Sequence, residues 1–265
     1  MATLAARSGL AYDDRGAGQP VVFLHGLTFD RSNWRPIVDR LGSRTRSLAV
    51  DLPGHGESGG GPCSLWEVAD RVQDLSDELG LERPIVVGHS MSGGIASIYG
   101  ATYPALGVVN VDQTMDVRPF AQMLRSAWPA LSGPGFDGVF EQIRKTMGMD
   151  LIPEPVRSRV LASQRANAEL VLGYWAELHD TDPDEMQARI EEMASGVQCP
   201  YLAVFGHCLE PSEREYTTAL VADLQMEEWE DSGHFVHLVH VDRFSARLSQ
   251  FIDSCRSGAD SPEDG

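Results

Sequence analysis

A serine stands where an apolar stretch gives way to a helical one, within the run Gly88-His89-Ser90-Met91-Ser92-Gly93. A sharp strand-to-helix turn needs small residues two positions to either side of the serine, and Gly88 meets this need while Ser92 nearly does. Such a turn exposes the hydroxyl and points the first N–H groups of the helix at the same place. A hydroxyl beside an anion site is what acyl transfer to a serine nucleophile requires.

Two other interpretations of this run stay open. A register shifted by two residues would make Ser92 the nucleophile, with Gly93 and Gly94 after it. Ser90 is favoured because it stands where the apolar stretch ends. A serine at a tight turn can also do no more than cap the following helix, so the short pattern needs support from the rest of the chain.

The candidate base is one of eight histidines. His234 lies in the stretch 231–235, directly after the strand that we expect at 226–229. A loop at the carboxyl edge of a parallel sheet would bring its imidazole within reach of Ser90. His89 is next to the serine, but we expect its side chain to point away from it. His234 is therefore the predicted general base.

Short apolar runs alternate with helical patterns along the chain, which predicts an α/β fold with a mainly parallel, twisted sheet flanked by helices. We expect strands at 10–14, 20–24, 46–50, 84–87, 107–111, 201–205 and 226–229. We expect helices at 33–41, 65–79, after Ser90 through Tyr99, at 213–224 and at 244–255.

Residues 114–198 differ from the rest because they contain no β-rich run. The segment is too long for an ordinary crossover between strands. It is predicted to be a helical cap inserted between two parts of a core domain, 1–113 and 199–256. The acidic stretch 257–265 is expected to be a disordered tail.

The composition is that of a globular protein with a formal net charge of −18. An acidic surface repels phosphate backbones and anionic lipids, so we expect neither nucleic acid nor membrane as a partner. We find no signal peptide and no apolar run of membrane-spanning length. The four cysteines are scattered, without metal-ligand spacing, which favours free thiols and a cytoplasmic location. A small molecule is the expected partner, and a homo-oligomer is compatible with the sequence.

Four stretches in the same order resemble motifs of the α/β-hydrolase fold superfamily, and the likeness extends over nearly the whole chain. They are residues 22–26, 51–58, 86–93 and 232–235. The resemblance implies a catalytic triad in the order serine then histidine, which matches Ser90 and His234. It also implies an oxyanion hole made by the backbone N–H groups of Leu27 and Met91. No metal or organic cofactor is implied.

The acid of the triad has two candidates. The superfamily usually supplies it three residues past a glycine at the end of the strand before the histidine, but Leu209 occupies that position here and Glu210 follows it. A second arrangement places the acid after the strand that follows the nucleophile's helix. Asp112 fits that place, at the end of the apolar run 107–111. A carboxylate directly after a buried strand needs a partner, so Asp112 is favoured, with Glu210 as the alternative.

The predicted function is hydrolysis of a carboxylic ester or lactone of a bulky, largely apolar small molecule. The alternatives are C–C bond hydrolysis of a β-diketone-like substrate, cofactor-free perhydrolysis, and ligand binding by a hydrolase fold without activity. His25 is also expected to brace the oxyanion loop. The candidate pocket residues are His25, Gly26, Phe120, Trp128, Phe136, Phe140 and Trp175.

Overall fold

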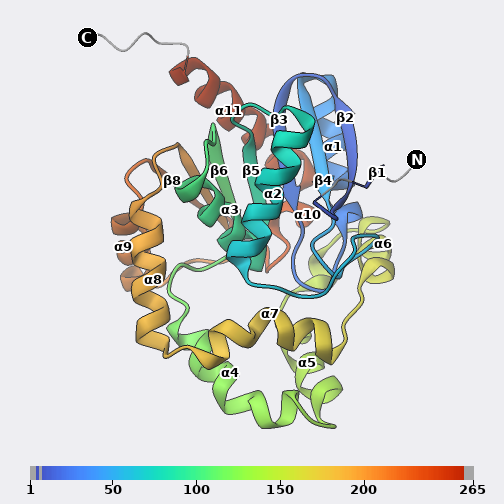
Figure 1. Ribbon diagram of the computed structural model, residues 1–265, viewed down its shortest axis with the longest axis vertical. Coiled ribbons are helices and arrows are strands. Elements are labelled where there is room, and N and C mark those ends of the chain that lie inside the picture. Colours follow the sequence, from blue (N-terminus) through green and yellow to red (C-terminus); the bar gives the residue numbers. More distant parts are fainter. Residues whose placement is uncertain (1–3, 6–7, 260–265) are drawn as a thin grey trace.

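A twisted sheet runs through the centre of the computed structural model, which describes residues 4–5 and 8–259 (Figure 1). Within these residues the sheet has eight strands in the order β1-β2-β4-β3-β5-β6-β7-β8. The first two strands are antiparallel to their neighbours and the others are parallel. The predicted α/β fold with a mostly parallel sheet is confirmed. The strands are β1 (Leu4–Ala5), β2 (Ala11–Gly16), β3 (Gln19–Leu24), β4 (Thr45–Val50), β5 (Ile85–His89), β6 (Gly107–Val111), β7 (Tyr201–Phe205) and β8 (Leu224–Glu228).

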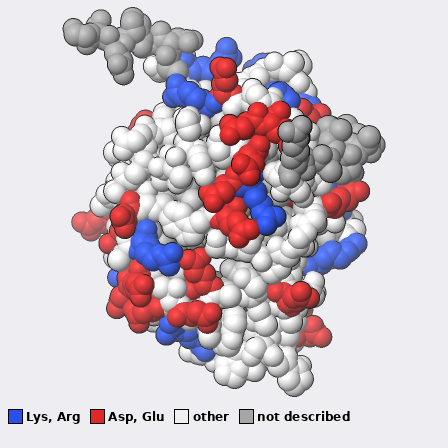
Figure 2. Space-filling view, in the orientation of Figure 1, with Lys and Arg blue, Asp and Glu red and all other residues white. Residues whose placement is uncertain are grey.

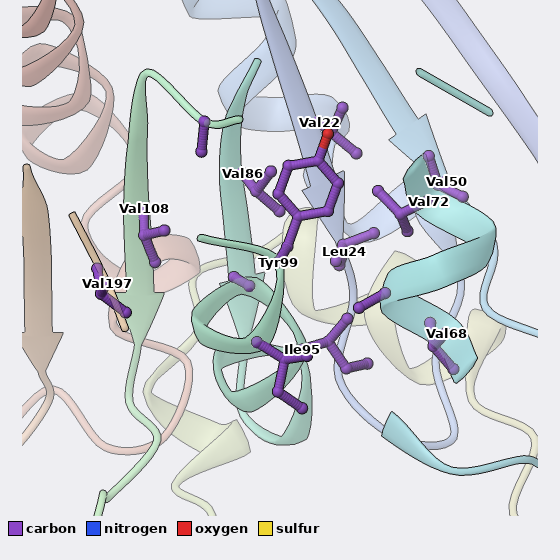
Figure 3. Close-up of a cluster of buried hydrophobic side chains, with 14 of the residues drawn as sticks. Val22, Leu24, Val50, Val68, Val72, Val86, Ile95, Tyr99, Val108 and Val197 are labelled. Atoms are coloured by element: carbon purple, nitrogen blue, oxygen red, sulfur yellow. The ribbon is translucent and has the colours of Figure 1, made fainter. Parts of the chain in front are cut away.

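The central strands are buried on both faces, which explains their continuous apolar runs. One face packs on α2 (Leu65–Leu79) and α3 (Met91–Thr102), where Val86 and Val108 meet Val72, Ile95 and Tyr99 (Figure 3). Each fully buried valine or leucine in such a core contributes about 1.5–3 kcal/mol.

The opposite face of the sheet is covered by helices from the two ends of the chain. They are α1 (Arg35–Leu41), which follows the short η1 (Arg31–Trp34), and α11 (Val241–Ala259). Successive side chains of a strand point to opposite faces of the sheet, and those on this face, such as Phe23 and Val87, share a cluster with Trp34 and Phe251. The sheet is thereby held between two helical layers, and the loops at its carboxyl edge are fixed in place.

Only helices and turns connect β6 to β7. In the view of Figure 1, α4, α5 and α7 lie below the sheet. They share a small apolar cluster that includes Leu124, Phe136, Phe140 and Trp175. The helices of this connection are α4 (Arg118–Leu131), α5 (Phe136–Lys145), η3 (Met149–Leu151), α6 (Val156–Ser163), α7 (Ala168–Asp180) and α8 (Pro183–Ser195).

The last of these helices, α8, packs with the main layer. Its Met193 and Ala194 are buried in the same cluster as Ile95 and Tyr99, and α8 contacts α3. A right-handed connection between neighbouring parallel strands needs a helix against the sheet, and α8 takes that place. The sequence prediction grouped α8 with the inserted segment, because both are helical and the pattern does not show which surface a helix covers.

The elements after β7 differ slightly from the prediction. Helix α9 (Pro211–Leu220) begins two residues before the helix expected at 213–224 and ends four residues before its end, and the short α10 (Val236–Val239) precedes the C-terminal α11. Earlier in the chain, η2 (Gly42–Arg44) lies between α1 and β4. Helix α11 continues to Ala259, so the first three residues of the predicted disordered tail are helical, and 260–265 lie outside the described residues. None of the helices in the described part of the chain is both long and apolar enough to cross a bilayer.

Candidate active site

Ser90 lies at the sharp turn between β5 and α3. Its backbone has φ 56° and ψ −134°, a conformation that costs a non-glycine residue of order 1–3 kcal/mol. The turn demands a glycine two residues earlier, because a Cβ on Gly88 would overlap the main-chain carbonyl group of Ser92. Ser90 lines the cavity described below, whereas Ser92 is buried and its hydroxyl donates to the main-chain oxygen of His25 at 2.5 Å. Ser90 is the serine that this turn exposes to the cavity.

His234 is hydrogen-bonded to Asp112, although 122 residues separate them in the chain. Nδ1 of His234 lies 2.7 Å from Oδ2 of Asp112, and the backbone N–H of Gly206 donates to Oδ1 at 2.7 Å. Glu210, the alternative acid, is exposed at the start of α9 and is not among the residues that line the cavity. Of the two candidate carboxylates, the structure brings Asp112 to His234.

Asp112 is almost fully buried, yet it remains ionised. Burial would raise the pKa of its carboxyl group, but bonds from His207, His234 and the Gly206 amide outweigh burial and hold that pKa well below the usual range. His207 lies 3.5 Å from Oδ1, and this contact raises the pKa of its imidazole. A bond from Nδ1–H of His234 to a charged Asp112 leaves Nε2 of His234 able to accept a proton.

The N–H groups of Leu27 and Met91 both belong to residues that line the cavity with Ser90. Among the described residues, no hydrogen bond uses either amide. Met91 is the first residue of α3, where backbone N–H groups have no partner inside the helix and the helix dipole favours negative charge. Two free donors next to a serine hydroxyl form a site where an oxyanion can bind.

Two buried histidines hold the loop that carries Leu27. His25 accepts a bond from the backbone N–H of Leu52, and His55 accepts one from that of Thr28, both at 3.1 Å. Burial lowers the pKa of His25 to about 4 and that of His55 to about 3, so both imidazoles are neutral near pH 7. His25 and Gly26 were predicted to line the pocket as well. They do not, because the His25 ring is buried between loops and Gly26 packs on His89.

His89 is a site residue whose role the sequence analysis missed. Its Nε2 lies 2.8 Å from the main-chain oxygen of His234, to which its N–H donates. Burial, together with the neighbouring imidazoles of His237 and His234, holds the pKa of His89 well below its usual value. The position of His89 next to Ser90 could have indicated this role. A side chain that points away from the serine must contact the segment that packs on the other side of the turn.

A cavity of about 640 Å³ opens at Ser90 and His234. Among the described residues, no hydrogen bond joins these two side chains, and such bonds are often loose before substrate binds. Of the predicted pocket residues, Phe120, Phe140 and Trp175 line the cavity. Further lining residues, which the sequence pattern did not single out, come from the core and from helices α7 and α8; they include Leu65, Trp66, Phe205, Leu178 and Met193.

Trp128 and Phe136 were also predicted to line the pocket, and the structure places them elsewhere. Trp128 stacks on His179, with ring centroids 3.9 Å apart. Phe136 stacks on Phe140 inside the apolar cluster of α4, α5 and α7. Both residues pack the helices between β6 and β7 against one another. An aromatic side chain in these helices can bury its apolar area against a neighbouring side chain as well as against a cavity, so its type alone does not show which it does.

Comparison with known proteins shows the family of this chain. Residues 21–247 match the sequence model of a family described as the alpha/beta hydrolase family. This chain belongs to the alpha/beta hydrolase family. The solved structures that resemble it include an E-2-(acetamidomethylene)succinate hydrolase, with a TM-score of 0.76 and 20% identity over 95% of this chain and 99% of the other. Another is Est816, an N-acyl homoserine lactone degrading enzyme, with a TM-score of 0.73 and 22% identity over 93% and 99% of the chains. Likenesses at this level of identity show the fold.

The curated relatives of this hydrolase-family chain fall into two kinds of match. The chain is 40% identical over 84 residues to the dihydrolipoyllysine-residue acetyltransferase component of the acetoin cleaving system of Cupriavidus necator, covering 31% of this chain and 22% of that protein. Matches to the first curated relatives span less than a third of their length. A longer match is the 2-hydroxymuconate semialdehyde hydrolase of a Pseudomonas species, 23% identical over 93% of this chain and 91% of that protein.

Proposed function

We propose that this protein is a serine hydrolase that cleaves a carboxylic ester or lactone of a bulky, largely apolar small molecule. The observation that carries the proposal is the 2.7 Å bond between Asp112 and His234 in the same cavity that the strained turn at Ser90 opens into. A nucleophile, a base oriented by an ionised acid and unpaired N–H donors are the parts that acyl transfer needs.

The reaction proceeds through an acyl-enzyme. Ser90 Oγ attacks the substrate carbonyl carbon while Nε2 of His234 takes the hydroxyl proton, and the N–H groups of Leu27 and Met91 bind the oxyanion. Collapse breaks the ester C–O bond, and His234 returns the proton to the leaving oxygen. Water then attacks the acyl carbon while Nε2 of His234 accepts one of its protons, the bond from this carbon to Ser90 Oγ breaks, and His234 returns the proton to Oγ as the carboxylic acid leaves. Asp112 stabilises the imidazolium in both halves.

The inserted helices act as a cap over this chemistry. Phe120 from α4, Phe140 from α5 and Trp175 from α7 line the same cavity as Ser90. Apolar walls exclude water and strengthen the electrostatic contacts of the site. A cavity of about 640 Å³ accommodates an acyl or alcohol group of drug-like size.

Active-site labelling combined with turnover tests the proposal. A fluorophosphonate probe should label the wild-type protein at Ser90, and the protein should hydrolyse 4-nitrophenyl esters of medium-chain acids. Ser90→Ala should abolish both, while Ser92→Ala should keep the labelling. An intact wild-type protein that neither labels nor turns over any ester or lactone would indicate a ligand-binding role instead.

C–C bond hydrolysis is the second candidate function. The long match to 2-hydroxymuconate semialdehyde hydrolase favours it, because that match covers nearly the full length of both chains. The same three residues would serve such a reaction. The kcat/KM for 4-nitrophenyl esters separates the two functions, since a dedicated C–C hydrolase should treat simple esters poorly.

A further inference from the structure

The cavity lining contains acidic side chains but no lysine or arginine among the described residues. The acidic side chains are those of Asp112, Glu177 and Glu213. His207 and His234 are the other titratable groups that line the cavity, apart from the phenol of Tyr174. A ligand that enters therefore meets apolar walls, carboxylates and two imidazoles.

Glu213, on α9, differs from the other two carboxylates, because Asp112 contacts His207 and His234 and Glu177 contacts Arg189 within ion-pair distance. Oε1 of Glu213 accepts a hydrogen bond of 2.8 Å from the hydroxyl of Thr114, and among the described residues no ion pair involves it. The neighbouring Arg214 is paired with Glu228 through two nitrogens. By contrast, Glu177 is paired with Arg189 at 2.9 Å.

His207 does not offer a spare positive charge to a ligand. Its Nδ1 lies 3.5 Å from Oδ1 of Asp112, and its side chain is 58% exposed to solvent. Glu213 and Glu228 also act on its imidazole. With three carboxylates around it, a protonated His207 is already neutralised by the protein.

We propose that the cavity selects uncharged substrates against those that carry a carboxylate, and that Glu213 is the residue that determines this specificity. The inference rests on the proposed ester hydrolysis. A substrate carboxylate would lose its hydration in an apolar cavity without gaining a cationic partner, and Glu213 would repel it as well. The net charge acts in the same direction, since Asp and Glu outnumber Lys and Arg by 39 to 21 and form several clusters on the face shown in Figure 2.

Two matched esters test this selectivity. The mono-4-nitrophenyl ester of suberic acid ends in a carboxylate, and its monoamide analogue ends in an uncharged group of the same size. We expect the wild-type kcat/KM for the amide-ended ester to exceed that for the carboxylate-ended ester by about 100-fold, and Glu213→Gln to reduce this ratio to about tenfold. Glutamine keeps the acceptor for Thr114, so the variant removes the charge and little else.

The matched control is Glu215→Gln, which removes a carboxylate from an exposed position of the same helix outside the cavity lining. This control should keep the wild-type ratio at low and at physiological ionic strength. A ratio near one in the wild type, or an equal ratio in the wild type and Glu213→Gln, would overturn the proposal. An equal change in both variants would assign the effect to net charge and overturn the role of Glu213.

A binding measurement separates this inference from the proposed function. Isothermal titration calorimetry of Ser90→Ala with the same two esters reports charge selection without any chemical step. Tighter binding of the amide-ended ester supports the selection, even if the wild type hydrolyses neither ester. Absence of hydrolysis would then contradict the proposed ester hydrolysis but not the charge selection. Equal affinities for the two esters would refute the selection.

Discussion

His89 donates a hydrogen bond of 2.8 Å from Nε2 to the main-chain oxygen of His234, 145 residues away in the chain. The bond ties the loop that carries the proposed base to the turn that carries the proposed nucleophile. Because burial holds the pKa of His89 low, the ring is neutral, and its single N–H is used in this bond. The spacing between Ser90 and His234 therefore depends on a third side chain.

Replacing His89 tests this dependence. His89→Leu leaves the carbonyl oxygen of His234 buried without its donor, which costs about 1–3 kcal/mol of stability. We also expect kcat to fall by about 10–100-fold with little change in KM, because displacement of the base by about 1 Å suffices for such a loss. His89→Gln, which can still donate, should recover part of kcat. Equal kcat in both variants and the wild type would show that the bond does not position His234.

The identity of the acid can be measured directly. Asp112→Asn should lower kcat by about 10³–10⁴-fold, because an amide cannot stabilise the imidazolium and favours the wrong tautomer of His234. Glu210→Gln should stay within about twofold of the wild type, as is usual for an exposed site away from the chemistry. Steady-state turnover of one ester by both variants decides the matter, and a large loss in Glu210→Gln alone would reverse the assignment.

Stability should fall between pH 6.5 and pH 4 because of the buried histidines. The pKa of His25 is lowered to about 4 and that of His55 to about 3, whereas an unfolded histidine titrates near 6.5. Below pH 6.5 the unfolded state binds more protons, so each of these groups removes about 1.4 kcal/mol of stability per pH unit. The contribution is fully present above pH 6.5 and lost as pH falls toward the folded pKa.

Denaturant unfolding at pH 7 and pH 5 checks this slope. We expect His55→Gln to lose about 2 kcal/mol less than the wild type between the two pH values, because one titrating group has been removed. We also expect His55→Gln to be less stable than the wild type at pH 7, so the comparison is made within each protein. An identical loss in both proteins would mean that His55 does not contribute to acid sensitivity.

Two glycines near the turn should respond in opposite ways to alanine. A Cβ on Gly88 overlaps the carbonyl group of Ser92, so Gly88→Ala should destabilise the fold by more than about 3 kcal/mol or prevent it from forming. A Cβ on Gly94 meets only Leu65 at 3.5 Å, an ordinary contact. Gly94→Ala should therefore raise the free energy of unfolding by about 0.5–1 kcal/mol, since alanine favours the helix. Thermal and denaturant unfolding of the two variants measure the contrast.

Local patterns in the chain were sufficient to predict many of its elements. Helix α2 was predicted at its observed bounds, since Ser64 caps its first turn by accepting from the N–H of Glu67, and Gly80 ends it in the left-handed conformation. The strand at 107–111 and the turn at Ser90 were readable for the same reason. In each case the neighbours that determine the conformation lie within a few residues.

Local patterns favoured Asp112 but left Glu210 open as the acid, and they did not reveal the role of His89 or most of the residues that line the cavity. The partner of Asp112 is 122 residues away, and the carbonyl that His89 holds is 145 residues away. Trp128 and Phe136 look like pocket residues in the sequence, as Phe120 does, because apolar area is buried equally well against a neighbouring ring or a cavity wall. The partner of each of these side chains depends on how segments that are distant in the chain pack across the sheet. A local sequence pattern does not specify such long-range contacts.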